Sequence, residues 1–176
     1  MAAQTWQIDK AHSHILFTVR HMVISKVRGR FLAWEGTLAL DEQDWSKSHV
    51  EVSIDAASIN THDEKRDGYL RSADLLDAEK FPALTFKSTK VEKTSGDKLK
   101  VTGDLTIRDV TRPVTLDVKL LGKAKDPRGN DKIAFHGKVA IQREEFGARW
   151  NQALEMGGVL VGKQVEINLE LQAIAA

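Results

Sequence analysis

The stretch KLKVTGDLTIRDVTRPVTLDVKL, which runs from Lys98 to Leu120, decides the fold class of this chain. Apolar residues alternate with polar ones along it in two runs: Leu99, Val101, Leu105 and Ile107, then Val114, Leu116, Val118 and Leu120. A period of two is typical of half-buried β-strands. Pro113 stands at the start of the second run, where its missing N–H does least harm. The stretch therefore predicts two antiparallel strands joined by a short turn.

The same alternation recurs along most of the chain. It is found at Ile15–Val19, Leu32–Leu40, Val50–Ala56, Leu84–Phe86, Ile133–Ile141 and Val165–Leu171. The connecting sequences KTSGDK and KDPRGNDK are rich in the Gly, Pro, Asn and Asp residues that reverse a chain. No connection between the later strands is long enough for a crossover helix, so a parallel sheet is disfavoured. The sequence predicts an all-β protein of about eight antiparallel strands.

The length of the predicted strands favours a barrel. Residues 98–108 and 132–142 can each form a strand of about ten residues, longer than the usual five or six. Long strands with one apolar and one polar face fit a closed barrel, and closure also removes exposed sheet edges. We therefore expect an antiparallel eight-stranded barrel, with a β-sandwich as the alternative.

Length and composition exclude several classes of protein. With 176 residues, 41% of them hydrophobic, the chain has the size of a single domain, which we expect to cover residues 1–176. A formal net charge of +1 gives no broad attraction to nucleic acid, so we expect no nucleic-acid partner. Because the chain has no cysteine, it has no disulfide, no thiolate metal site and no cysteine nucleophile.

The first residues, MAAQTWQIDK, lack the basic and apolar segments of a leader peptide. No later apolar run reaches membrane-spanning length, so we expect a soluble protein with at most transient membrane contact. We expect a cytoplasmic location. The small residues of AAQ also fit a periplasmic or secreted protein whose leader has been cleaved.

One segment, INTHDEKRDGYLRSADLLDA (Ile59–Ala78), breaks the strand pattern. Its capping-box spacing and its i,i+4 charge pair predict a helix from about His62 to Ala73; the residues concerned are Thr61 with Glu64 and Asp67 with Arg71. The apolar content of this helix is too thin for a core helix. We expect it to cover the open end of the barrel, with the bulky residues after it, such as Leu75 and Leu76, closing an apolar opening.

Several motifs together resemble the YceI-like family. They are TWQIDKAHSHILFTVRH, GRFLAWEGTLALD, ASINTHDEKRDGYLRSADLLDAEKFPALTFKS, GDLTIRDVTRPVTLDV and IQREEFG, which cover most of the chain in the family's order and spacing. The resemblance implies a lipocalin-like antiparallel β-barrel with a helix near its open end. It also implies that a long apolar molecule, typically a polyisoprenoid, binds inside the barrel.

The side chains that we expect to point inward support an apolar interior. The clean alternating runs place no Asp, Glu, Lys or Arg inside. We expect the lipid-binding residues to be Phe17, Val19, His21, Trp34, Leu38, Val52, Ile54, Tyr69, Leu70, Leu75, Leu76, Phe86, Leu105, Ile107, Leu116, Val118, Phe135, Val139 and Ile141. The same residues also fit a plain core that leaves no room for a ligand.

Polar residues near the mouth are candidates for a lipid head group. His21 ends the run that contains Phe17, and Arg66 and Arg71 lie on the predicted helix. Arg143, in IQREEF, matches a position of the family motif. The alternative is that Arg66 and Arg71 pair with Asp67 or dock the helix onto the barrel rim.

Other functions have weaker support. His12 and His14, with His21 or His62, could bind a metal, but this spacing alone is weak evidence, and we expect no metal and no cofactor. The chain lacks a nucleophile elbow and a phosphate-binding loop, so we do not expect an enzyme. The enzyme alternative is a small barrel hydrolase or isomerase that uses His21 with Asp67.

A third alternative is a protein-interaction module with a filled core. The sequence VISKVRGRF with the methionine before it, and the sequence ARWNQALEMGGVLVG, carry apolar residues that could form a homodimer face or the mouth of the barrel: Met22, Val23, Ile24, Trp150 and Met156. The sequence does not separate these two roles.

Overall fold

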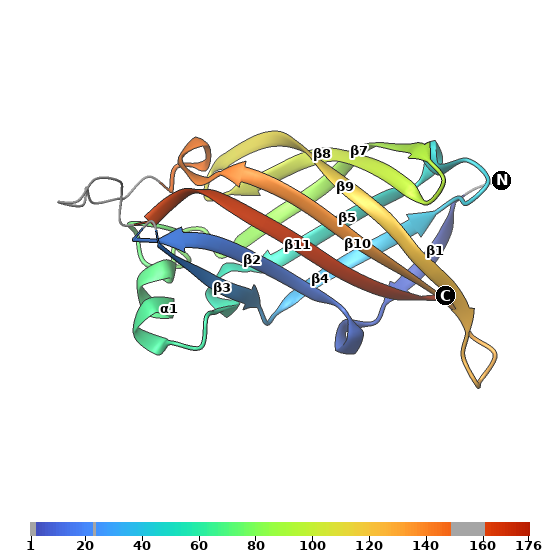
Figure 1. Ribbon diagram of the computed structural model, residues 1–176, viewed down its shortest axis with the longest axis horizontal. Helices are drawn as coiled ribbons and strands as arrows, with labels where there is room; N and C mark the ends of the chain where they lie inside the picture. The colour runs from blue at the N-terminus through green and yellow to red at the C-terminus, as the bar shows by residue number, and fades with distance from the viewer. Residues whose placement is uncertain (1–2, 23, 149–160) are drawn as a thin grey trace.

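The computed structural model describes residues 3–22, 24–148 and 161–176, and it is dominated by β-structure (Figure 1). The strands are β1 (Gln4–Ile8), β2 (His14–His21), β3 (Ser25–Phe31), β4 (Trp34–Leu40), β5 (His49–Asp55), β6 (Ile59–Asn60), β7 (Ala83–Ser95), β8 (Lys98–Ile107), β9 (Val110–Lys125), β10 (Asp131–Gln142) and β11 (Val161–Ala175). The α-helix of the described residues, α1, spans Glu64–Arg71. Short 3-10 turns are η1 (Lys10–His12), η2 (Trp45–Lys47), η3 (Ala56–Ser58) and η4 (Arg143–Phe146).

The strands close into an eight-stranded antiparallel barrel, as predicted. Three of the eight barrel strands are interrupted, so each carries two labels. Strand β1 continues as β2 after η1, β3 continues as β4 after a short bend, and β5 continues as β6 after η3. The barrel closes where β11 pairs first with β2 and then, near the C-terminus, with β1, for example Trp6 with Ala175. Every strand pairing is antiparallel, which confirms the sequence-based prediction.

The alternation that predicts β8 and β9 sets their register. Leu99 pairs with Val118 and Val101 with Leu116. Along β8, buried residues alternate with exposed or half-buried ones, as expected for a strand with one face toward the core. Most of the buried hydrophobic residues of the described chain form one cluster inside the barrel.

Glycines on the inner face make room for large neighbours. A Cβ added to Gly29 would lie 2.5 Å from Cζ of Phe17, its register partner across β2 and β3. A Cβ on Gly103 would lie equally close, at 2.5 Å, to Cζ of Phe86. A side chain at either position would collide with the aromatic ring, so these glycines shape the interior without needing an unusual backbone conformation.

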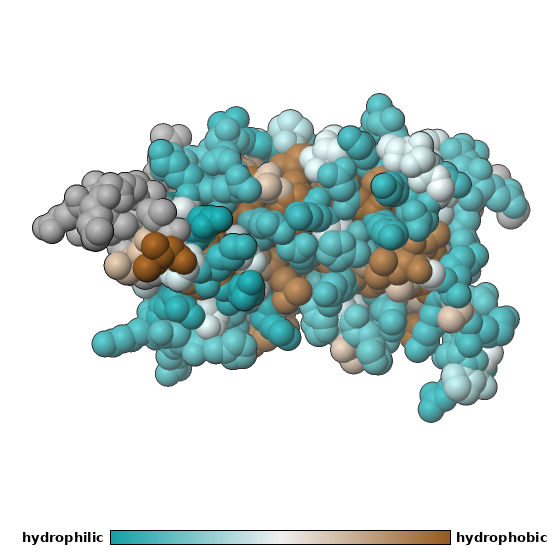
Figure 2. Space-filling view, in the orientation of Figure 1, coloured by the Kyte–Doolittle hydropathy of each residue, from teal (hydrophilic) through white to brown (hydrophobic). Residues whose placement is uncertain are grey.

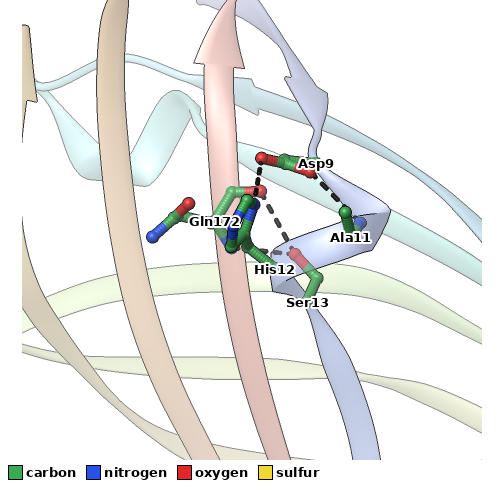
Figure 3. Close-up of polar contacts among 5 residues, drawn as sticks. All are labelled: Asp9, Ala11, His12, Ser13 and Gln172. Atoms are coloured by element: carbon green, nitrogen blue, oxygen red, sulfur yellow. Dashed lines mark hydrogen bonds and ion pairs between the residues drawn. The ribbon is translucent and has the colours of Figure 1, made fainter. Parts of the chain in front are cut away.

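A polar corner turns β1 into β2 (Figure 3). Asp9 caps η1 by accepting from the Ala11 N–H at 3.1 Å, and its other oxygen lies 2.8 Å from Nδ1 of His12. The hydrogen bond to His12 is the main reason that the pKa of Asp9 is lowered. Ser13 is buried and joins the corner to β11, because its hydroxyl donates to the Gln172 carbonyl at 3.2 Å and accepts from the Gln172 N–H at 2.9 Å.

Some expectations about the strands were wrong or incomplete. The alternation did not identify β1, β3 or β6 as strands. Leu32, expected on the inner face, is 64% exposed because it lies in the bend between β3 and β4, where its N–H donates to the Ser58 carbonyl. The bend rotates the chain, so that Trp34, two residues later, is buried.

The helix is shorter than predicted and is capped differently. Asp63, not Thr61, is the N-cap residue, and its side chain accepts from the Arg66 N–H. The capping box and the Asp67–Arg71 pair were therefore wrong predictions: the Asp67 carboxylate accepts from both the N–H and the hydroxyl of Thr61. Among the described residues, no helix is long and apolar enough to cross a bilayer.

Candidate functional site

The barrel encloses two apolar cavities, one toward each end. We call the end covered by α1 the lid end, and the end that holds the two chain termini the terminal end (Figure 1). The cavity toward the terminal end has a volume of about 80 Å³. Its lining is almost entirely apolar: Ile15, Trp34, Leu38, Leu40, Trp45, Ser48, His49, Val50, Val52, Phe86, Val91, Leu99, Val101, Leu116, Val118, Phe135, Gly137, Leu169 and Leu171.

The cavity at the lid end has a volume of about 120 Å³. It is bounded by the barrel wall, by η4 and by the segment around α1: Phe17, Val19, Phe31, Ile59, Leu70, Leu75, Leu76, Leu84, Ile107, Ile141, Arg143, Phe146, Ala148, Val165 and Ile167. Among the described residues of this lining, Arg143 is the one that carries a charge. The two cavities together make an interior suited to hydrocarbon rather than to a polar ligand.

A layer of side chains lies between the two cavities. Ile54, Leu105 and Val139 occupy intermediate levels of their strands and line neither cavity. Their role in lipid binding stays a prediction, since an eight-stranded barrel is narrow enough for inward side chains to fill its middle. Tyr69, also expected in the lining, instead hydrogen-bonds through its hydroxyl to Asp74 at 3.3 Å.

The terminal end is closed by apolar packing. Trp45, on η2, lies edge-on to Phe135 with ring centroids 6.3 Å apart. The loop before it is held by Asp41, which is buried and whose carboxylate accepts from the N–H groups of Gln43 and Asp44. The strand pairings of β1 with β4 and of β1 with β11 lie at the same end.

Hydrogen bonds from arginines add to the apolar packing that closes the lid end. Arg66 donates to the Thr61 hydroxyl and carbonyl, each at 2.8 Å, and Arg71 donates to the Ala57 carbonyl at 3.4 Å. Both side chains dock the helix onto the chain before it. This geometry favours the docking role that the sequence left open over the head-group role.

Arg108 is a lid contact that the sequence did not reveal. It lies in the turn between β8 and β9, and its guanidinium donates to the carbonyls of Ala73 and Leu75 at 3.0 and 2.7 Å. It also lies over the ring of Phe81, 5.6 Å from the centroid. Because its partners are more than thirty residues away in the chain, no local pattern could identify this contact.

The barrel wall is also less tightly joined near the lid. Among the described residues, the pairing of β9 with β10 runs from Lys125 with Asp131 to Asp117 with Lys138 and ends there. Beyond that point a groove of about 380 Å³ separates the two strands. Arg112 bridges it by donating to the Glu145 carbonyl at 2.8 Å.

Arg143 is the head-group candidate that the structure places at a cavity. It is 6% exposed, and burial lowers the pKa of its guanidinium. It donates to the carbonyls of Gly162 and Ala148 at 2.8 and 2.6 Å. A charged donor therefore lies at the lid end of an otherwise apolar space.

The structure brings most of the predicted lining residues together. Trp34, Leu38, Val52, Phe86, Leu116, Val118 and Phe135 line the cavity toward the terminal end, and Phe17, Val19, Leu70, Leu75, Leu76, Ile107 and Ile141 line the cavity at the lid end. Their role in lipid binding stays a prediction. The side chains of His21 and of Val23, Trp150 and Met156 lie outside the described part of the chain.

Much of the remaining lining was missed. The alternation could have found four of these residues, because they lie at the alternating positions that were predicted to face inward: Ile15, Val101, Val165 and Leu169. Trp45, Ile59 and Phe146 lie in or beside short 3-10 turns, where no period of two marks the inner face.

The histidines and acids of the described regions do not gather into a metal-binding group. His12 is held by Asp9, and no group of three or more His, Asp or Glu side chains able to bind a metal occurs in residues 3–22, 24–148 and 161–176. Asp67, the proposed partner of His21, is buried and accepts two hydrogen bonds from Thr61.

Comparison with known proteins identifies the family. The YceI-like domain model matches residues 6–173. The chain belongs to the YceI-like family. The protein YceI of Escherichia coli O157:H7 is 39% identical over 149 residues, covering 84% of this chain and 78% of the relative. A UPF0312 protein of Pseudomonas paraeruginosa is 36% identical over 174 residues, covering 98% and 87%.

Solved structures of the YceI-like family and of similar proteins agree with the barrel. The Campylobacter jejuni YceI protein has a TM-score of 0.77 and 31% identity, covering 89% of this chain and 90% of that one. Burkholderia cenocepacia BcnA has a TM-score of 0.83 at 23% identity, covering 94% and 99%. A polyisoprenoid-binding domain from Saccharophagus degradans has a TM-score of 0.66 at 15% identity, covering 99% of both chains. The resemblance and the lipocalin-like fold are therefore confirmed.

Proposed function

We propose that this protein binds a polyisoprenoid or another long-chain amphiphilic lipid inside the barrel, and that it sequesters or carries the lipid without chemical reaction. The observation that carries the proposal is the pair of apolar cavities between a plugged end and a lid held by hydrogen bonds. The Saccharophagus degradans domain supports it, since a protein of the same fold is described as binding a polyisoprenoid.

The interior must rearrange to hold a long chain. At about 80 and 120 Å³, each cavity is smaller than the roughly 150 Å³ cavity that binds benzene in an engineered protein. We propose that the bound chain displaces the layer of Ile54, Leu105 and Val139 and joins the two cavities. Each buried CH₂ contributes about 0.8 kcal/mol, so a chain of several isoprene units has enough driving force to offset the cost of this repacking.

The apolar tail dominates the affinity in this proposal. The Arg143 guanidinium already donates to two carbonyls. An anionic head group that binds it must replace those hydrogen bonds, so the net gain in binding free energy is only the difference between the new and the old bonds. A prenyl alcohol and the matching pyrophosphate should therefore bind with affinities within about tenfold of each other, a free-energy difference of about 1.4 kcal/mol. A preference for the pyrophosphate of several orders of magnitude contradicts this.

Displacement of a fluorescent fatty probe by a prenyl alcohol tests the proposal. Val118→Phe fills the cavity toward the terminal end and should weaken binding of the alcohol at least tenfold. Leu121→Phe is the matched control, because Leu121 lies on the same strand and is 59% exposed. Gly137→Val is a second filling variant, since a Cβ there meets only ordinary contacts of 3.6 Å.

Two results would overturn the proposal. One is an unchanged affinity in both filling variants while each remains folded by circular dichroism. The other is steady consumption of the lipid by the wild-type protein, followed by mass spectrometry, because a carrier returns its lipid unaltered.

A further inference from the structure

The hairpin of β2 and β3 exposes apolar side chains at its tip. Ile24 is 88% exposed and Met22 is 46% exposed. Figure 2 shows apolar residues gathered at the end of the molecule where this hairpin lies. Side chains of this size normally gain by leaving water, so a pair at one protruding tip is typical of a contact surface.

Cationic side chains flank the tip on the outer face of the hairpin. Arg20, Lys26 and Arg28 are exposed, and Arg20 is the register partner of Lys26. Arg30 follows on the same face and is half-buried. The acid nearest to this face along β11 is Glu166, which forms an ion pair with Lys138 at 3.3 Å. The hairpin therefore presents positive charge behind an apolar tip.

The inner face of the same hairpin lines the lid-end cavity. Phe17 and Val19 of β2 and Phe31 of β3 contribute to that lining. In Figure 1 the tip of β2 and helix α1 lie at one end of the barrel, opposite both termini. Whatever binds the tip therefore lies next to the end of the barrel that is closed by the lid.

We propose that the β2–β3 hairpin docks the protein onto an anionic lipid bilayer, with Met22 and Ile24 in the interface and Lys26 and Arg28 at the lipid head groups. The combination of a small apolar tip and flanking cations fits an anionic membrane surface. A second copy of the chain is a poorer partner, because a symmetric contact at the tip brings the cations of both hairpins together. The docking does not require that the interior bind a lipid.

Cosedimentation with vesicles tests the docking. The protein should bind vesicles of phosphatidylcholine and phosphatidylglycerol at least tenfold more strongly than vesicles of phosphatidylcholine alone, and added salt should weaken the binding. The double substitution Met22→Ser with Ile24→Ser should reduce binding to the anionic vesicles at least tenfold. Leu121→Ser, at another exposed apolar side chain, should leave it unchanged.

A second double substitution tests the role of the cations. Lys26→Gln with Arg28→Gln should reduce binding about 25-fold, or about fivefold for each cation. Lys98→Gln with Lys119→Gln removes another exposed cross-strand pair of lysines and should have little effect. All four hairpin substitutions should leave the affinity for the prenyl alcohol unchanged, which separates this proposal from the proposed function.

Three results would overturn the docking proposal. The first is equal binding to the two kinds of vesicle. The second is equal loss of binding in the hairpin variants and in their controls. The third is a dimer in sedimentation velocity that Met22→Ser with Ile24→Ser dissociates while vesicle binding is unchanged, which assigns the tip to a contact between copies.

Discussion

The two ends of the barrel are closed by different kinds of interaction. At the terminal end, Ile133 and Ala173 are register partners with exposures of 1% and 0%, and Trp45 packs on Phe135. At the lid end, the one fully buried residue of α1 is Asp67, a carboxylate bonded to Thr61. Apolar burial closes the terminal end, whereas at the lid end buried apolar side chains such as Leu75 and Phe146 are joined by hydrogen bonds from arginines to backbone carbonyls.

Because of this difference, the interactions that keep the barrel folded are largely distinct from those that close its interior to solvent at the lid end. Apolar packing at the terminal end is part of the core, so opening that end amounts to unfolding. Hydrogen bonds such as those from Arg108 to the Ala73 and Leu75 carbonyls can exchange with water while the barrel stays closed. We therefore expect the lipid of the proposed function to enter at the lid end, where opening does not require loss of the fold.

The largest expected effect is at the terminal end. Phe135→Ala removes a buried ring that packs against Trp45 and lines a cavity, and it should lower the free energy of unfolding by about 3–5 kcal/mol. Urea denaturation measures this. Leu121→Ala, at an exposed position of the neighbouring strand, should change stability by less than about 0.5 kcal/mol. A loss below about 1 kcal/mol for Phe135→Ala would mean that this end is not closed by packing.

A smaller loss is expected where a glycine makes room at the lid end. Gly29→Val places a Cβ 2.5 Å from the Phe17 ring and 2.8 Å from the Thr61 methyl group, and it should cost about 1–3 kcal/mol of stability. The displaced ring should also enter the lid-end cavity and weaken binding of the prenyl alcohol. Gly122→Val is the control, because a Cβ at Gly122 meets nothing within 4 Å. Equal stabilities of the two variants would contradict the described packing.

Arg108→Ala should open the lid with little effect on the barrel. Loss of two hydrogen bonds to carbonyls should lower the local stability of residues 72–78 by about 1–2 kcal/mol and leave the global stability nearly unchanged. Hydrogen exchange of the amides in residues 72–78 should become faster, while the amides of β8 and β9 stay protected. Arg128→Ala, at an exposed turn, serves as the control. Uniformly faster exchange throughout the barrel would contradict a separate lid.

The smallest effect concerns pH and the corner between β1 and β2. The pKa of Asp9 is lowered in the folded state, first by its hydrogen bond to His12, so its ionised form is stabilised. The stabilisation of the fold by ionised Asp9 is fully present above the ordinary Asp pKa of about 3.9, and it is lost as the pH falls through the lowered pKa. Asp9→Asn keeps a good cap and should cost less than about 1 kcal/mol at neutral pH. The difference in unfolding free energy between Asp9→Asn and wild type should vanish in acid, which urea denaturation at several pH values can measure. A difference that grows in acid would contradict this prediction.

The sequence predicted the barrel better than it predicted the rim. Long strands such as β8 and β9 alternate cleanly, so their inner faces were evident. Strand β3 was missed because Gly29 interrupts its inner face and cations occupy its outer face. The cap of α1 was misassigned because the Thr61 hydroxyl is used by Asp67, a tertiary preference that no local pattern records.

The shape of the interior could not be predicted from the sequence. Alternation shows which side chains point inward, but not whether they meet. Ile54 and Leu105 belong to the same buried core cluster, and whether such side chains fill the interior depends on the width and packing of all eight strands at once. Arg108 was missed for a related reason, because its partners become neighbours only after the barrel has closed.

Methyl NMR during titration with geranylgeraniol tests the central claim most directly. The account predicts shifts for methyl groups in both cavities, including Leu116 and Leu169 near the terminal end and Ile141 and Ile167 near the lid, together with Leu105 between them. The exposed residues Leu32 and Leu121 should not shift. Saturable binding that shifts only exposed methyl groups, or no binding at all, would contradict a lipid site inside the barrel.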